Sequence, residues 1–227
     1  MFEPNLESLQ TILKYHFNNL KILKTALTHR SSLNENRGQE SNERLEFLGD
    51  AVLELVISTF LFKTKSSEPE GVLTAARSAI VRTESLATIA QKLNLGKFLI
   101  MSKGEEASGG RSNQSLLANT VEAVIGAVYL DSNFEITKTF VEEHILNHAQ
   151  TILKNQPLKD NKSRLQEAVQ RQGLSSPTYQ EISSSGPDHN KIFTVSVSVD
   201  NKPLATGTGK SKQEAEQNAA AKAISLV

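Results

Sequence analysis

The stretch from 42 to 56 constrains the fold of this chain more than any other part of it. Its sequence is NERLEFLGDAVLELV, and at 3.6 residues per turn its apolar side chains cover most of the circumference of a helix. Four carboxylates, Glu43, Glu46, Asp50 and Glu54, recur three or four residues apart and therefore share one stripe. Carboxylates in apolar surroundings are costly unless a positive charge meets them. The pattern favours a metal cation as the missing partner, although a solvated acidic face is the commoner explanation for a charge run.

A second stretch, 116–130, carries polar residues in an otherwise apolar helix. Asn119 and Glu122 lie three residues apart and project from one face, and Glu122 is difficult to explain as a solvent-facing residue there. Carboxylate and amide oxygens without His or Cys favour a hard cation, Mg²⁺ or Mn²⁺. We therefore predict that Glu46, Asp50, Asn119 and Glu122 hold Mg²⁺, which Mn²⁺ could replace. Hydrolysis of a phosphodiester bond is a reaction that such an ion supports.

The spacing of apolar residues divides the chain into two parts. Residues 6 to about 149 have a helical period throughout, whereas residues 193–199 alternate polar and apolar side chains, as in a strand with one buried face. Strands on either side, a short helix ending at Gly173 and a final helix from Ser211 give the order helix, three strands, helix. We therefore predict a multidomain protein with an all-helical domain over 1–153, a linker over 154–160 and a small α+β (α-β-β-β-α) domain over 161–227.

The helical part also yields predictions about individual elements. Asn42 or Ser41 is expected to cap the acidic helix with its side chain. Residues 72–93 are expected to form one long helix, and residues 102–113 a loop before the apolar helix. A last amphipathic helix should run from Phe134 to about Lys154.

Charge and composition limit the classes of partner and site. The 25 basic and 25 acidic residues cancel, which argues against a nucleic-acid partner, but residues 159–227 alone have 9 basic and 7 acidic residues. Any RNA contact must therefore be local. The absence of Cys excludes a disulfide scaffold, a thiolate metal site and a Cys nucleophile. The first residues lack a signal-peptide pattern and the longest apolar run, 116–130, is short of the roughly 20 residues of a membrane span, so we expect a cytoplasmic protein without a membrane partner.

Two sequence motifs resemble those of a known family. ERLEFLGD at 43–50, and LANTVEA at 117–123 followed by Ile125-Gly126, resemble the two catalytic helices of the ribonuclease III family. The resemblance covers nearly the whole chain, because bacterial members follow the nuclease domain with a linker and one double-stranded-RNA-binding domain. It implies an all-α ribonuclease III nuclease domain followed by that small α+β domain.

The resemblance also implies roles for individual residues. Asp50 and Glu122 would be most directly tied to the attacking water, and Glu46 and Asn119 would complete the Mg²⁺ site. Glu43 and Glu70 would be supporting acids, Glu70 matching an acidic residue that the family has ahead of the 74–82 helix. Asn119 stands where many members have Asp, which implies weaker metal binding or a role through water.

The same resemblance implies a homodimer. In the family the acidic helix lies at a two-fold interface, where Phe47 would pack into the partner and each copy would cut one strand. Gly49 inside this helix indicates a close backbone approach, because a mid-helix Gly costs about 0.5–1 kcal/mol relative to Ala. Packing within one chain is the alternative explanation for Gly49.

The tail has features of an RNA-binding surface. SKQE at 211–214 fits a capping box, which places a helix N-terminus beside two Lys side chains and so forms a phosphate clamp. An ordinary capped helix with surface lysines is the alternative. With residues of the first helix and of the loop between the first two strands, this clamp resembles the three-point footprint of a double-stranded-RNA-binding domain, which reads A-form shape. The residues of this footprint are Gln166, Glu167, His189, Lys210, Ser211 and Lys212.

The predicted function is that of a metal-dependent endoribonuclease that hydrolyses double-stranded RNA. By resemblance, it would leave 5′-phosphate and 3′-hydroxyl ends and act in ribosomal and messenger RNA processing. One alternative is a duplex-RNA-binding regulator whose nuclease site is degraded at Asn119. Another is a helical scaffold with an RNA-binding tail, in which Glu46 and Glu122 would lie on distant faces.

Overall fold

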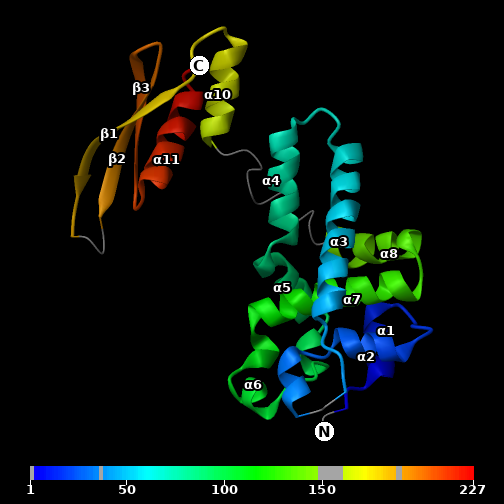
Figure 1. Ribbon diagram of the computed structural model, residues 1–227. Coiled ribbons are helices and arrows are strands. Elements are labelled where there is room, and N and C mark those ends of the chain that lie inside the picture. Colours follow the sequence, from blue (N-terminus) through cyan, green and yellow to red (C-terminus); the bar gives the residue numbers. More distant parts are fainter. Residues whose placement is uncertain (1–2, 36–37, 148–160, 188–190) are drawn as a thin grey trace. The chain divides into compact units, whose positions relative to one another are not determined.

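The chain separates into two compact units, residues 1–156 and 157–227, in a computed structural model (Figure 1). The structure describes residues 3–35, 38–147, 161–187 and 191–227. The first unit is helical, and the second has the order helix, three strands, helix, so the predicted fold class is confirmed. The predicted linker, 154–160, lies outside the described residues, and the exact domain boundaries stay a prediction.

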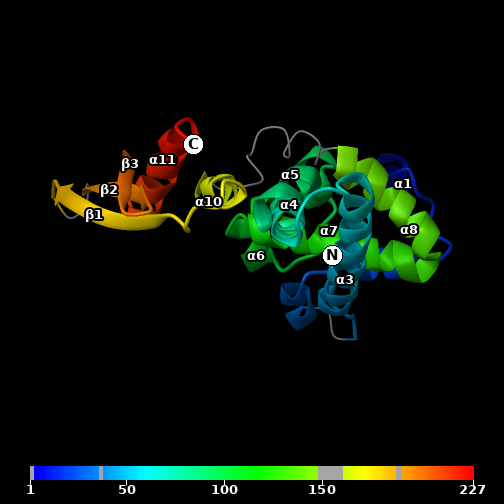
Figure 2. The same cartoon turned by 90° about the horizontal axis from the view of Figure 1, so that it is seen from above.

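The helical unit is built around one central helix, α7 (Gln114–Asp131). Its other helices are α1 (Leu6–Leu13), α2 (Leu20–Ala26), α3 (Glu43–Thr64), α4 (Glu70–Val81), α5 (Thr83–Lys92), α6 (Lys103–Ala107) and α8 (Phe134–Val141). Short 3₁₀ turns η1 (Arg30–Asn34), η2 (Leu95–Lys97) and η3 (Gly110–Ser112) and a π turn η4 (Glu142–Leu146) complete it. Because α2, α3, α5 and α8 all pack on α7, that helix is apolar almost all round (Figures 1 and 2).

Helices α3 and α7 approach each other closely because two glycines face each other. A Cβ added at Gly49 would contact backbone atoms of Glu122 and Gly126, and one added at Gly126 would contact the backbone of Leu45. The close approach expected at Gly49 therefore exists, and it lies within one chain. Both glycines are buried in the contact, so any side chain there would push the two helices apart.

The prediction of one long helix over 72–93 is wrong. Helix α4 ends at Val81, Arg82 adopts an extended backbone (φ −61°, ψ 154°), and α5 begins at Thr83. The buried Ser85 hydroxyl donates to the Ala79 carbonyl oxygen at 2.8 Å, which satisfies a carbonyl that the helix break exposes. The break lets α4 pack on α3 while α5 packs on α7, so tertiary contacts override a continuous helical period.

Other local expectations are corrected as well. Asn42 precedes α3 but makes no side-chain cap bond, and the Ser41 hydroxyl bonds the Glu43 carboxylate at 2.8 Å instead, so the predicted cap of α3 is wrong. The expected loop over 102–113 contains α6 and η3. The expected helix from Phe134 starts there, but it changes to the π turn after Val141, and its end beyond 147 lies outside the described residues.

The second unit consists of α10 (Asn161–Arg171), β1 (Thr178–Ser185), β2 (Ile192–Val199), β3 (Lys202–Gly209) and α11 (Lys212–Ile224). The strands form an antiparallel sheet in the order β1-β2-β3, with α11 across β2 and β3 and α10 beside α11. Alternate residues of β2, including Val197 and Val199, are buried against an Ala-rich side of α11. Gly173 (φ +73°) follows the end of α10 as predicted, and Asp200 and Asn201 have the positive φ angles of a type I′ hairpin turn.

Among the described helices, none combines the length and the apolar character that crossing a bilayer requires.

Candidate active site

The crossing of α3 and α7 brings together four of the predicted site residues. Glu46 and Asp50 lie one turn apart on α3, on either side of Gly49 in the contact with Glu122. Asn119 belongs to the same face of α7 as Glu122, and its amide donates a hydrogen bond to the Glu46 carboxylate. Two motifs some 70 residues apart in the sequence therefore form one polar cluster.

The acids on α3 are held in an environment that disfavours their charge. Burial raises the pKa of Glu46, and the repulsion from Glu43 and Asp50 adds to this, while the Asn119 hydrogen bond partly offsets it. Burial also raises the pKa of Asp50, and Glu54 raises it further. The stripe of like charges is therefore unfavourable for the protein alone, as the sequence indicates.

Glu122 has the largest perturbation in this cluster. Burial, followed by repulsion from Asp50 and from Glu46, raises its pKa from 4.5 to about 7. Glu46 and Glu122 thus interact electrostatically and do not lie on the distant faces that a plain scaffold requires. A strongly perturbed carboxyl that is coupled to two others indicates a functional site.

The donor chemistry of the cluster fits a hard divalent cation. Three carboxylates and one amide supply only oxygen ligands, and a cation would remove the repulsion that raises these pKa values. As the side chains stand, however, the described residues include no group of three or more His, Cys, Asp or Glu side chains that could hold a metal ion. The assignment of Glu46, Asp50, Asn119 and Glu122 as metal ligands therefore stays a prediction.

Glu43 is paired with a basic side chain that the sequence did not point to. The Arg30 guanidinium lies 3.6 Å from its carboxylate, and both line a pocket of about 370 Å³ that also reaches Glu46 and Asn119. The His29 N–H donates to the Ile100 carbonyl oxygen at 2.8 Å, which fixes the backbone next to Arg30. The only sequence signal was a basic residue in THRS at 28–31, without any indication of its partner.

Glu70 is not brought to the other acids. It is the first residue of α4, its carboxylate accepts a hydrogen bond from the Thr74 hydroxyl at 3.0 Å, and it lines a pocket with Ser58 and Phe62 on α3. Phe62 follows Asp50 by 12 residues, or about 18 Å along a helix. The predicted supporting role of Glu70 is therefore not tested by the structure of a single chain.

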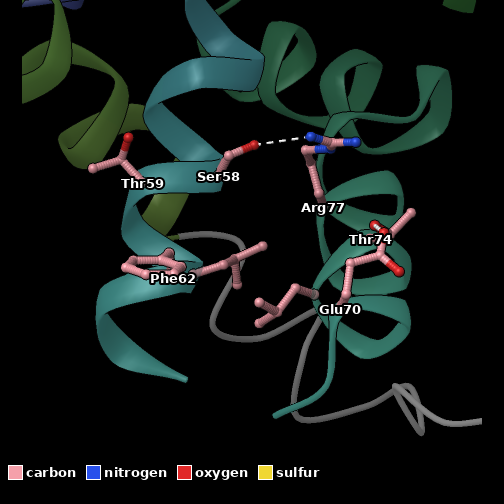
Figure 3. Close-up of a pocket in the computed structure, with 8 residues that line it drawn as sticks. Ser58, Thr59, Phe62, Glu70, Thr74 and Arg77 are labelled. Carbon is pink, nitrogen blue, oxygen red and sulfur yellow. Dashed lines mark hydrogen bonds between the residues drawn. The ribbon is translucent and has the colours of Figure 1, made fainter. Parts of the chain in front are cut away.

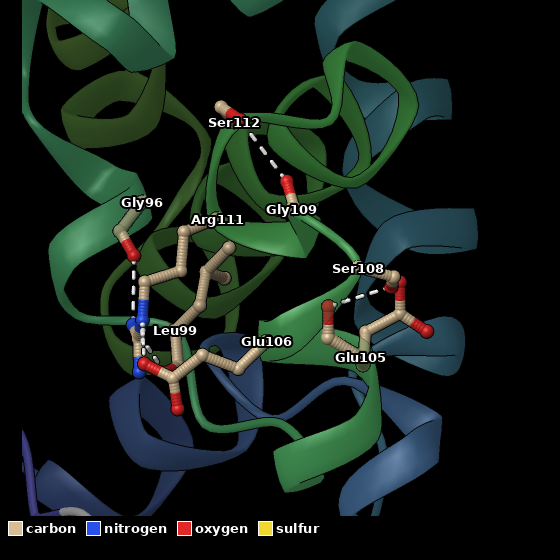
Figure 4. A network of polar contacts seen from close by, with 8 residues as sticks. All are labelled: Gly96, Leu99, Glu105, Glu106, Ser108, Gly109, Arg111 and Ser112. Atoms are coloured by element: carbon tan, nitrogen blue, oxygen red, sulfur yellow. Dashed lines mark hydrogen bonds and ion pairs between the residues drawn. The ribbon is translucent and has the colours of Figure 1, made fainter.

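A polar network anchors the loop that leads into α7 (Figure 4). Arg111 pairs with Glu106 at 2.6 Å and donates to the carbonyl oxygens of Gly96 and Leu99 at 2.9 and 3.0 Å. The Asn113 side chain then caps α7 by accepting the Ser115 and Leu116 N–H groups. Arg111 and Asn113 therefore help to position the helix that carries Asn119 and Glu122.

The predicted RNA-binding residues of the second unit lie at its helix ends and surface. Ser211 caps α11 by accepting the Glu214 N–H at 3.2 Å, and the Glu214 carboxylate accepts the Lys210 N–H at 2.7 Å. Lys212 pairs with Glu181 of β1 at 2.7 Å, which raises the pKa of Lys212. Gln166 and Glu167 lie on α10, where Gln166 is exposed. His189 lies outside the described residues.

Helix α3 also exposes large apolar side chains. Phe47, Leu55 and Phe62 recur at intervals of eight and seven residues and are 80%, 54% and 73% exposed. Beside Phe47 is a hollow of about 940 Å³ whose lining includes Ile22, Leu45 and Leu130. Exposed apolar residues in a row along one helix indicate a contact surface.

Comparisons with known proteins cover both units. Residues 19–149 match the family model described as Ribonuclease-III-like, and residues 161–227 match the double-stranded RNA binding motif. Ribonuclease 3 of Carboxydothermus hydrogenoformans is 48% identical over 229 residues, which cover 100% of this chain and 97% of that protein. Ribonuclease 3 of Clostridium acetobutylicum is 44% identical over 222 residues, which cover 98% of this chain and 96% of that protein.

Solved structures give the same relation for the helical unit. The nuclease domain of ribonuclease III from Campylobacter jejuni is 40% identical, with a TM-score of 0.59, covering 67% of this chain and 99% of that one. A second structure of that domain, described by its flexibility in a region involved in dimer formation, is 41% identical with a TM-score of 0.59, covering 66% and 99%.

Proposed function

Because this chain belongs to the ribonuclease III family, we propose that it is a metal-dependent endoribonuclease that hydrolyses double-stranded RNA to 5′-phosphate and 3′-hydroxyl ends. The observation that carries the proposal is the meeting of Glu46 and Asp50 on α3 with Asn119 and Glu122 on α7. The second unit, which matches a double-stranded RNA binding motif, supplies the binding surface.

The proposed cofactor is Mg²⁺, for which Mn²⁺ could substitute. Bound by Glu46, Asp50, Asn119 and Glu122, it would activate a water molecule and stabilise the leaving oxygen. Asp50 and Glu122 orient the attacking water from opposite helices. The Asn119 amide keeps the Glu46 carboxylate in place, and the half-buried Glu122 carboxyl, with its pKa of about 7, can hold a proton near neutral pH until the site is loaded.

Arg30 gives Glu43 a defined supporting role. With the guanidinium 3.6 Å away, the Glu43 carboxylate is partly neutralised and adds less repulsion to Glu46. Glu70 is proposed as the second supporting acid by resemblance alone. In the second unit, Lys210, Ser211 and Lys212 would contact phosphates at the start of α11.

We further propose that the protein acts as a homodimer through α3. Phe47 is a protruding side chain, and the adjacent hollow lined by Ile22, Leu45 and Leu130 can receive an aromatic ring. A two-fold contact requires a protruding side chain and a matching hollow on the same surface, because each copy then inserts its own Phe47 into the hollow of the other copy. Two sites in one dimer would cut the two strands of a duplex.

The natural substrates are proposed to be ribosomal and messenger RNA precursors with duplex segments, encountered in the cytoplasm. The proposal follows from the family and from the second unit's match, since a double-stranded RNA binding domain recognises A-form shape rather than a particular sequence.

Cleavage of a long RNA duplex in Mg²⁺ tests this proposal. Wild type should produce short duplexes with 5′-phosphates, and Glu122→Gln should lose at least about 100-fold in rate, because it removes a charged ligand from the cation. Glu54→Gln is the matched control, since Glu54 lies on the same stripe one turn beyond Asp50. Binding without cutting at every Mg²⁺ or Mn²⁺ concentration would instead support the regulator.

The Asn119 position gives a finer test. Asn119→Asp should lower the Mg²⁺ concentration for half-maximal rate, because it adds a negative charge beside Glu46. An unchanged or higher Mg²⁺ requirement would count against ligation at this position.

A further inference from the structure

A second pocket lies between α3 and α4, farther along α3 than the proposed site (Figure 3). It measures about 460 Å³, and its lining residues are Ser58, Thr59, Leu61, Phe62, Glu70, Leu73, Thr74 and Arg77. Arg77 is the one basic side chain in this lining. The pocket therefore combines a single guanidinium with three hydroxyl groups, one carboxylate and three apolar side chains.

The Arg77 guanidinium is oriented but not neutralised. Its Nη1 donates to the Ser58 hydroxyl oxygen at 3.0 Å, which holds the group against α3. Within the described ranges no carboxylate lies close enough to form an ion pair with Arg77, whereas Arg30, Arg82 and Arg111 each pair with a Glu. The Glu70 carboxylate in the same lining is bonded to Thr74 instead. Arg77 therefore keeps its full positive charge and free donors for an external anion.

The position of the pocket follows from the spacing of α3. Asp50, Glu54 and Ser58 recur at four-residue intervals, so Ser58 continues the acidic stripe toward the end of the helix. Eight residues separate Asp50 from Ser58, which is about 12 Å of helix. One strand of a duplex carries a phosphate every few ångströms along its axis, so a strand passing Asp50 can present another phosphate at Arg77.

We propose that Arg77 binds a phosphate of the RNA backbone a few nucleotides from the bond that is cut. The inference rests on the proposed function. A guanidinium matches a phosphate in charge and geometry and can bond two of its oxygens at once, while Ser58 fixes its direction. Arg77 is thus a positioning residue: it sets the register of the strand over Asp50 and Glu122 and takes no part in the chemistry.

The salt dependence of duplex binding tests this role, measured with the full chain in EDTA so that the RNA stays intact. Arg77→Gln keeps a donor for Ser58 but removes the charge. Its dissociation constant should rise about twofold to fivefold, and the slope of log K against log salt should fall in magnitude by about 0.9. Arg77→Lys should keep the wild-type slope. Arg82→Gln is the matched control, because that Arg already pairs with Glu84.

The outcomes separate the two proposals. A slope for Arg77→Gln equal to those of wild type and Arg82→Gln would overturn the inference even if wild type cuts RNA. A chain that binds duplex RNA but never cuts it would refute the nuclease, and the slope would still report on Arg77, because it needs no cleavage. Loss of all duplex binding by wild type would refute both.

A measurement on wild type covers the case in which Arg77→Gln does not fold. Ethylation of single RNA phosphates should weaken binding at a position within about four nucleotides of the cut, apart from the cut itself. The absence of any such position would overturn the inference.

Discussion

Replacing Gly49 by Ala should drive α3 and α7 apart. The new Cβ would lie 2.6 Å from the Glu122 carbonyl carbon and 2.8 Å from the Gly126 nitrogen, well inside the usual 3.5–4.0 Å contact. These are backbone atoms that cannot turn aside. Overpacking of this kind costs about 1–3 kcal/mol and occasionally more, and the better helix propensity of Ala returns at most about 1 kcal/mol. Because the contact involves several backbone atoms, we expect a net loss of about 2–3 kcal/mol.

Calorimetry of the full chain measures this loss. For a unit of this size each 1 kcal/mol shifts the melting temperature by about 2–4 °C, so the helical unit should melt about 4–12 °C lower. Gly71→Ala is the control, because a Cβ there meets nothing within 4 Å. The variant should also lose nuclease activity at temperatures where it stays folded, since Asp50 moves away from Glu122. A melting temperature of Gly49→Ala equal to that of wild type would refute the close contact between α3 and α7.

Three further predictions concern charged groups. The folded pKa of Glu122, about 7, exceeds the ordinary value of 4.5. The protonated carboxyl therefore contributes stability below pH 4.5, and this contribution is lost as the pH rises through 7. In thermal melts in EDTA at pH 8, Glu122→Gln should be more stable than wild type by on the order of 1 kcal/mol, allowing for solvent screening, and the two should not differ below pH 4.5. Burial raises the pKa of Asp131, but hydrogen bonds from the N–H groups of Asn18 and Asn19 lower it overall. Asp131→Asn should therefore lower stability at neutral pH by about 1 kcal/mol or less, allowing for solvent screening, and the difference in melting temperature should close as acid protonates the wild-type carboxylate. Glu181→Gln should release Lys212 and tighten duplex binding about twofold at low salt, as a titration of labelled RNA would show; equal affinities would count against Lys212 as an RNA contact.

Much of the fold could be predicted because its signals are local. The alternation of Val195, Val197 and Val199 identifies a strand, and the capping box at Ser211 identifies the start of α11. The break at Arg82 could not be predicted, because the apolar period continues through it and only the packing of α4 and α5 on different helices requires it. The missing side-chain cap of α3 at Asn42 is a similar case.

In the candidate site too, residues with a local sequence signal could be predicted, whereas contacts that depend on tertiary packing could not. Glu46, Asp50, Asn119 and Glu122 could be identified because their spacing places each pair on one helix face, and the structure brings the two pairs together. Partners that lie outside the motifs could not. Arg77 bonds Ser58 across 19 positions of sequence, and no local pattern indicates that contact.

The central claim is that a cation neutralises the cluster to which Glu122 belongs. A carbon-13 NMR titration of the Glu122 side-chain carboxyl, with and without Mg²⁺, tests it most directly. The account predicts a pKa of about 7 without Mg²⁺ and a fall of at least about one unit at saturating Mg²⁺, because a bound cation favours the charged carboxylate. An identical titration in the presence and absence of Mg²⁺ would contradict metal binding at this cluster.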